Sequence, residues 1–186
     1  KEGTPEKLRG VGIAIGGYNV TGGVNDHAEV ELGLNPDGTV TNYNTWEDQG
    51  QGADVGTLVL THEALKPLGL DWTQIKLVQA DTAQAPITGP AGANRSHYVA
   101  GNATIDAANQ LMDAMRKPAG TFRTYQEMEA EGIPTKYLGV FDTTSITEDL
   151  DPNTGEGAPT PEYNYVMFLT EVEVEAATGK ATVLSM

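Results

Sequence analysis

The stretch from Thr45 to Asp54 constrains the fold most, because within it a strand pattern changes directly into a helical one. Glycines at positions 50 and 52 flank Gln51. Such glycines let a backbone approach a ligand closely, and the N–H groups at the start of the next helix point back at the loop. The Gln51 amide can both donate and accept hydrogen bonds. The pattern predicts either a cofactor-holding turn or a plain chain reversal between a strand and a helix.

A second loop of the same kind follows. Residues 81–95 are rich in proline, glycine and alanine, and they lie between an expected strand at 72–80 and an expected helix at 97–116. Within this loop, Gly89–Ser96 has almost no bulky side chains. Two such loops side by side would converge two helix N-termini on one ligand. The alternative is two ordinary connections between strands and helices.

The remaining periodicity predicts strands at 10–18, 28–34, 40–46, 137–141, 163–174 and 181–184, and a short helix within 120–128. The helix expected at 54–66 has an apolar stripe formed by Val55, Leu58, Val59, His62 and Leu65, in which His62 reads as a half-buried residue with a satisfied ring. The stripe of the helix at 97–116 is formed by Val99, Ala103, Ala107, Leu111 and Met115. This order predicts an α+β fold, a single two-layer domain over residues 1–186 with two helices packed on a mixed β-sheet.

Charge and composition exclude several classes of function. The chain has 26 acidic and 11 basic residues, a net charge of −15, which opposes binding to nucleic acid or to an anionic membrane. It contains no cysteine, so it carries neither a thiolate metal site nor an iron–sulfur cluster. No apolar run is long enough for a membrane span, and a cytoplasmic location is expected. The abrupt start and the end within a strand pattern suggest part of a longer protein.

Other possible sites are weaker. His27, His62 and His97 show no ligand spacing, so no metal ligand is predicted in the chain. Glu47 and Asp48 are adjacent, and because neighbouring side chains of a strand or turn point in different directions they make a poor acid/base pair.

Three stretches together resemble the molybdenum-cofactor-binding subunit of the xanthine oxidase family: Trp46–Asp54, His62–Gly69, and Gly89–Ser96 with Gly101–Ala103. The likeness extends along nearly the whole chain. It is greatest to the bacterial molybdenum aldehyde oxidoreductases, which the chain also resembles over residues 117–165.

This resemblance implies roles for both loops. Gln51 matches a catalytically important glutamine whose amide hydrogen-bonds an oxygen ligand of the metal without binding the metal itself, and Gly50 and Gly52 match glycines beside the pterin. Asn94 stands where the family often has a hydroxyl residue. The loop that carries the pterin phosphates and lines the floor under the metal corresponds to Ala91, Gly92, Ala93, Asn94, Arg95 and Ser96.

The family inserts a water-derived oxygen at a C–H bond, so the resemblance implies an enzyme component that oxidises an aldehyde to a carboxylic acid with molybdopterin and molybdenum. Tungsten, and a cytosine dinucleotide form of the pterin, remain open. The 2Fe–2S clusters, and FAD where a flavin is used, are expected on partner chains or domains, with the rest of the molybdopterin subunit as a further partner. The alternatives are hydroxylation of an N-heteroaromatic substrate and a non-catalytic scaffold module.

The family's catalytic glutamate lies in a Gly-X-Gly-Glu motif that has no match here, since Gly155–Gly157 lies in an acidic loop and does not fit. The isolated chain is therefore expected to be inactive, as a fragment or as one chain of a split enzyme.

Overall fold

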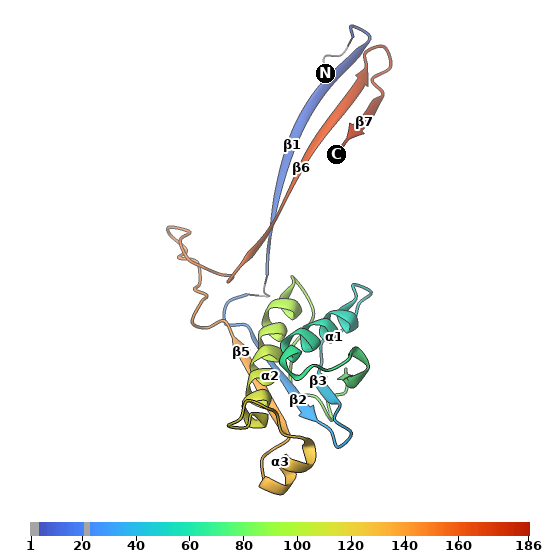
Figure 1. The fold of residues 1–186 in the computed structure, drawn as a ribbon. Coiled ribbons are helices and arrows are strands. Elements are labelled where there is room, and N and C mark those ends of the chain that lie inside the picture. Colours follow the sequence, from blue (N-terminus) through green and yellow to red (C-terminus); the bar gives the residue numbers. More distant parts are fainter. Residues whose placement is uncertain (1–3, 21–22) are drawn as a thin grey trace. The chain divides into compact units, whose positions relative to one another are not determined.

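The computed structural model describes residues 4–20 and 23–186. Contacts within the chain divide it into two compact units, a larger one over Asn19–Glu162 and a smaller one formed by the described residues up to Tyr18 together with Tyr163–Met186 (Figure 1). The single domain predicted over residues 1–186 includes both units. Each unit is described by itself, and the candidate site lies within the larger one.

The larger unit is built on a four-stranded mixed sheet with the order β4-β3-β2-β5. β2 (His27–Leu34) pairs antiparallel with β3 (Val40–Asn44) and with β5 (Lys136–Asp142), whereas β3 runs parallel to β4 (Ile75–Gln79). A tight turn joins β2 to β3, closed by the Gly38 N–H donating to the Asn35 carbonyl at 2.9 Å. This turn lies where the Asn-Pro-Asp-Gly sequence predicts it.

The described chain contains three α-helices, α1 (Ala53–Ala64), α2 (Gly101–Met115) and α3 (Tyr125–Glu131). Shorter helical turns are η1 (Lys66–Leu68), η2 (Trp72–Gln74) and η3 (Ser96–Ala100). α2 lies along β2 and β5 (Figure 1). The prediction of an α+β fold with helices packed on a mixed sheet is therefore confirmed, with α3 as the short helix expected after residue 120.

Some boundaries differ from those predicted. The strand expected at 72–80 starts only at Ile75, because Asp71 caps a helical turn over the preceding residues by accepting from the Thr73 N–H at 3.0 Å. The helix expected at 97–116 begins with a π-helical turn, and β3 ends two residues before Trp46. Local capping chemistry of this kind moves element ends without changing their order.

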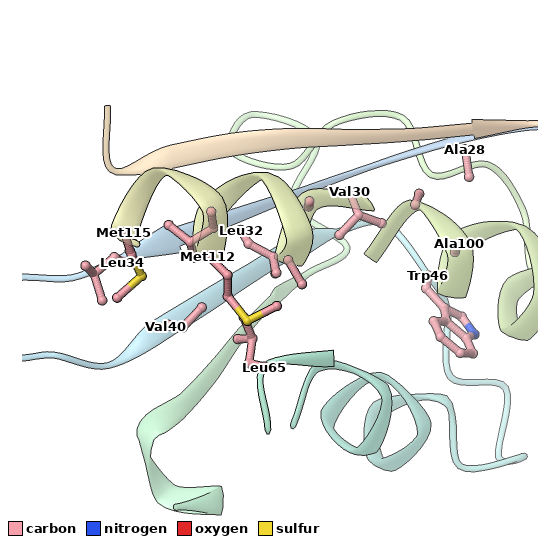
Figure 2. Close-up of a cluster of buried hydrophobic side chains, with 14 of the residues drawn as sticks. Ala28, Val30, Leu32, Leu34, Val40, Trp46, Leu65, Ala100, Met112 and Met115 are labelled. Carbon is pink, nitrogen blue, oxygen red and sulfur yellow. The ribbon is translucent and has the colours of Figure 1, made fainter. Parts of the chain in front are cut away.

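The main hydrophobic core lies between the sheet and α2 (Figure 2). Ala28, Val30 and Leu32 of β2 are 0%, 1% and 0% exposed. The stripe predicted for the second helix is buried, as expected, at Val99, Ala103, Ala107, Leu111 and Met115. Gly139 of β5 marks the closest approach of helix and sheet, because a Cβ there would lie 2.8 Å from the Ala107 Cβ and would overlap the helix backbone.

The stripe predicted for α1 is correct at its end, where Leu65 is 0% exposed, but wrong at Val55 and Val59. Val55 and Val59 are 64% and 46% exposed, and the helix buries Thr57 and Thr61 instead. The reason is polar: β3 presents Asn42, whose Nδ2 donates to the Thr61 hydroxyl at 2.8 Å, and that hydroxyl donates to the Thr57 carbonyl at 2.7 Å. A buried amide needs such partners, so threonines rather than valines face the strand.

The predicted role of His62 is confirmed. Its side chain is half-buried, with Nε2 3.1 Å from the Leu70 carbonyl oxygen, and its ring stacks on Trp72 with 3.6 Å between centroids.

The smaller unit is a three-stranded sheet with the order β1-β6-β7, made of β1 (Lys7–Asn19), β6 (Tyr163–Glu175) and β7 (Ala181–Ser185). β6 and β7 are antiparallel, with Val172 opposite Val183. None of the unit's described residues is buried, and Ile15 of β1 and Tyr165 of β6 are 73% and 76% exposed. This sheet therefore lacks a core of its own.

Among residues 4–20 and 23–186, no helix is long and apolar enough to cross a membrane.

Candidate functional site

The loop between β3 and α1 and the loop that leads into η3 line one pocket. Its volume is about 440 Å³, which lies in the range of small-molecule and cofactor sites. The two loops are far apart in the sequence, and the fold brings them to the same pocket, as the first of the two alternatives required. The pocket is lined by Trp46, Gln49, Gln51, Gly52, Ala53, Gly56, Ala91, Gly92, Ala93, Asn94, Ser96 and His97.

The first loop depends on its glycines for backbone conformation. Gly50 and Gly52 have φ of +100° and +86°, a region that residues with a side chain rarely adopt. No neighbouring atom lies within 4 Å of a Cβ built at either position, so space is not what requires glycine there. The two residues bend the chain so that Gln51 faces the pocket between them.

The Asp48 carboxylate organises the same loop. It accepts from the N–H groups of Gly50 at 2.7 Å, Gly52 at 3.3 Å and Asp54 at 3.2 Å. The hydrogen bonds from Gly50 and then Asp54 lower the pKa of Asp48, because they favour its charged form. The N–H groups at the start of α1 were expected to point back at the loop, and the Asp54 N–H does so, but it is bonded to Asp48 instead of being left for a ligand.

Gln51 uses its amide as both donor and acceptor, as predicted from the residue type. Its Oε1 accepts from the Gln49 N–H at 2.6 Å, and its Nε2 donates to the Glu47 carbonyl at 3.1 Å. The amide nitrogen carries a second N–H. The side chain is thus oriented by its own loop while it lines the pocket.

The second loop is tightly coiled. Ala93 and Asn94 have φ of +45° and +56°, two consecutive left-handed residues, and the Arg95 N–H closes the turn on the Gly92 carbonyl at 2.7 Å. Asparagine tolerates this conformation, whereas for alanine it costs about 1 kcal/mol. Backbone strain of this kind is common at functional sites.

Arg95, predicted to bind cofactor, does not line the pocket. Its side chain is 6% exposed, and Nε donates to the Asp26 carboxylate at 2.7 Å. The guanidinium also donates to the carbonyls of Thr88 at 2.8 Å and Pro90 at 3.2 Å, and to that of His27. Arg95 therefore fastens the second loop to the chain at the start of β2.

Two further contacts join the loops to each other and to the sheet. The Glu47 carboxylate accepts from the Ala91 N–H at 2.6 Å, which bridges the loops directly. The Thr45 N–H donates to the Thr88 hydroxyl at 2.9 Å, and the Thr88 N–H donates to the Thr45 hydroxyl at 3.1 Å. The adjacent Glu47 and Asp48 thus both serve loop structure, one between the loops and one within the first.

Trp46 is held by a buried polar network that starts on β3. The backbone N–H of Trp46 donates to the Asn44 side-chain oxygen at 2.8 Å, and the Asn44 side-chain nitrogen donates to the Asn42 side-chain oxygen at 2.9 Å. Gln79 of β4 lies 3.5 Å from both the Asn44 oxygen and the Trp46 carbonyl. The signal available in the sequence is the pair Asn42 and Asn44, amides at alternate positions that face the same side of a strand.

Within the described part of the chain, two buried side-chain polar atoms have no hydrogen-bond partner, Trp46 Nε1 and Ser96 Oγ. Both residues line the pocket. Since native structures leave few such groups, these two call for an explanation.

Most predicted site residues line the pocket, namely Gln51, Gly52, Ala91, Gly92, Ala93, Asn94 and Ser96. Gly50 and Arg95 lie beside it. The prediction missed Trp46, Gln49 and His97; of these, His97 is exposed and is the one described lining residue with a titratable side chain. No group of three or more His, Asp or Glu side chains in the described ranges could hold a metal ion.

A two-layer α+β unit with two loops around one pocket is the arrangement of a cofactor-binding domain, and the family model for the molybdopterin cofactor-binding domain matches residues 1–186. The chain belongs to this family. The resemblance to the xanthine oxidase family is confirmed by the relatives below.

The aldehyde oxidoreductase of Megalodesulfovibrio gigas is 41% identical over all 186 residues, which correspond to 20% of its length. The crystal structure of the aldehyde oxidoreductase from Desulfovibrio desulfuricans is 49% identical, with a TM-score of 0.86 over 97% of this chain and 20% of that one. The CO dehydrogenase of Oligotropha carboxidovorans shares the fold, with 18% identity and a TM-score of 0.66 over 96% of this chain and 25% of that one. The chain thus spans about a fifth of the length of its aldehyde oxidoreductase relatives.

Proposed function

We propose that this chain forms part of the molybdopterin site of a molybdenum hydroxylase that oxidises an aldehyde to the carboxylic acid with water as the oxygen source. The observation that carries this proposal is the single pocket lined by both loops. The names of the relatives support the aldehyde as substrate class.

The residues of the pocket fit such a cofactor. Pterin rings and phosphates present many acceptor atoms, and the pocket offers neutral donors in Trp46, Ser96 and the Gln51 amide. Small residues from 91 to 94 leave room for a flat ring or a phosphate close to the backbone. Local neutral donors allow an anionic group to bind despite the net charge of −15.

In this proposal Gln51, Gly52, Ala91–Asn94 and Ser96 hold the cofactor, with Gly50 bending the first loop and Arg95 fastening the second. When bound, the molybdenum cofactor supplies the redox centre for the oxidation. The second N–H of the Gln51 amide would be available to donate to an oxygen of the bound cofactor. Among the described residues that line the pocket, His97 is the one with a titratable side chain, and we expect the isolated chain to be inactive.

The remaining parts of the site belong to the rest of the molybdopterin subunit. Electrons leave through 2Fe–2S clusters, and through FAD where a flavin is present, on partner chains or domains. The cytoplasm is the proposed location.

Metal and pterin analysis of the full-length native assembly, combined with oxidation of an aldehyde in ¹⁸O-labelled water, tests the proposal. Stoichiometric molybdenum and pterin with one labelled oxygen in the acid are expected. A preparation without pterin would favour a scaffold module, and activity on N-heteroaromatic rings alone would favour the other substrate class.

Gln51→Ala in the full-length enzyme should lower turnover by roughly 5- to 150-fold, because a donor that the bound cofactor would cover contributes about 1 to 3 kcal/mol. Gln84→Ala is the matched control, since it removes an exposed amide that lies outside the pocket. Wild-type turnover and metal content in Gln51→Ala would remove the role assigned to this residue.

A further inference from the structure

The two partnerless polar atoms lie in the same pocket although they come from different loops. Trp46 is 7% exposed and Ser96 is 6% exposed, and Nε1 of one and Oγ of the other lack a hydrogen-bond partner. An indole nitrogen can only donate, whereas a hydroxyl can donate and accept. Leaving such a group unmet costs stability, so its presence on the wall of a pocket indicates a ligand that meets it.

Trp46 is fixed at its backbone by hydrogen bonds and is packed at its ring. Its backbone N–H is bonded to Asn44, which is 1% exposed and bonded in turn to Asn42, which is 0% exposed. On the other side, the far edge of the indole packs against Gly56, where an added Cβ would lie 3.6 Å from the ring. Trp46 occupies one end of the core cluster, away from Met115 and Leu34 (Figure 2).

We infer that the Trp46 indole N–H donates a hydrogen bond to an acceptor atom of the cofactor bound in this pocket, with the Ser96 hydroxyl as the second contact. This inference rests on the proposed function and adds Trp46 to the residues that bind the cofactor. The recognised atom is an oxygen or an unprotonated ring nitrogen, because the indole can only donate. Asn44, itself bonded to Asn42, holds the backbone of Trp46.

Both atoms are screened from water, so contact requires a small displacement of the residues that cover them. The indole N–H then exchanges an unmet state for a bonded one. Cofactor binding thereby removes the cost of the unmet donor, and this adds to the stability that the cofactor gives the folded protein.

Trp46→Phe in the full-length protein tests this inference through cofactor retention. Phenylalanine keeps an aromatic ring and removes the N–H, but it is smaller than the indole and leaves a cavity in the core cluster, which lowers the melting temperature by itself. The stability test in the cofactor-free protein therefore uses Ser96→Ala, which removes the other unmet group with little change in volume and should melt at the same or a higher temperature than wild type. The loaded Trp46→Phe variant should lose pterin and molybdenum roughly threefold to tenfold faster on dilution, as expected for one lost hydrogen bond.

Trp72→Phe is the matched control. It changes the chain's other tryptophan, which is 46% exposed, stacked on His62 and outside the pocket, and it should leave cofactor loss unchanged. Ser96→Ala should also lose cofactor faster than wild type, and it provides a second measurement if the ring substitution disturbs folding.

A wild-type protein that contains no pterin would overturn the proposed function. Wild-type protein with pterin, together with unchanged cofactor loss in Trp46→Phe, would overturn this inference alone. In that case the partner of the indole is a bound water or nothing.

Discussion

At the scale of single residues, two carboxylates hold the loops of the site in shape. Glu47 accepts from the Ala91 N–H of the other loop, and Asp48 accepts from three N–H groups, two in its own loop and one at the start of α1. Adjacent side chains that point in different directions make a poor acid/base pair, which the sequence did indicate. The bridge from Glu47 to the second loop could not be predicted, because it depends on a loop that is distant in the sequence.

The lowered pKa of Asp48 makes the first loop sensitive to acid. A folded-state pKa below the ordinary value of about 3.9 means that the stabilisation is fully present above that value and is lost as the pH falls through the lower, folded pKa. The melting temperature of wild type should therefore exceed that of Asp48→Asn near neutral pH, and the difference should shrink below about pH 4. A difference that stays constant from pH 7 to pH 3 would contradict this role.

At the scale of elements, periodicity predicts α2 well and α1 poorly. The α2 stripe faces an apolar strand, so burial follows hydrophobicity, and its predicted residues Ala103, Ala107, Leu111 and Met115 are buried as expected. α1 faces Asn42 on β3, so the polar Thr57 and Thr61 are buried, while Val55 is exposed. Burial on a helix thus follows what the opposing strand presents, and single-sequence periodicity does not contain that information.

The contact of α2 with β5 predicts a sharp effect of Gly139→Ala. The new methyl group would overlap backbone atoms of the helix, which cannot move independently, so the free energy of unfolding should fall by about 1 to 3 kcal/mol or more. Gly33→Ala on β2 is the control, because its methyl would meet the flexible Lys136 side chain at 3.1 Å. Urea unfolding of the two variants measures the difference, and equal stability would show that α2 shifts freely on the sheet.

At the scale of the whole molecule, the smaller unit exposes apolar strands on a sheet without a core. Ile13 and Met167 are each 66% exposed. Apolar surface of this extent normally marks a covered interface. The chain spans about a fifth of the length of its aldehyde oxidoreductase relatives, and we expect polypeptide outside these 186 residues to cover the apolar faces of this sheet.

The isolated 186 residues should therefore self-associate through this sheet. The net charge of −15 opposes non-specific aggregation, so defined oligomers are expected. They should retain no pterin, because we propose that the chain supplies only part of the site. Sedimentation velocity with the absorbance spectrum of the same sample measures both properties. A stable monomer that keeps a cofactor band would contradict the view that this chain supplies only part of the site.

The central claim is that the two loops form one cofactor pocket, and Ala93 tests it most directly. Ala93 lines the pocket in a left-handed conformation. Leucine there should fill the space and lower the pterin and molybdenum content of the full-length protein at least roughly tenfold while the fold persists. Ala93→Gly, which relieves the backbone strain and adds no volume, should keep the full content. Equal cofactor content in Ala93→Leu, Ala93→Gly and wild type would contradict a cofactor site between these loops.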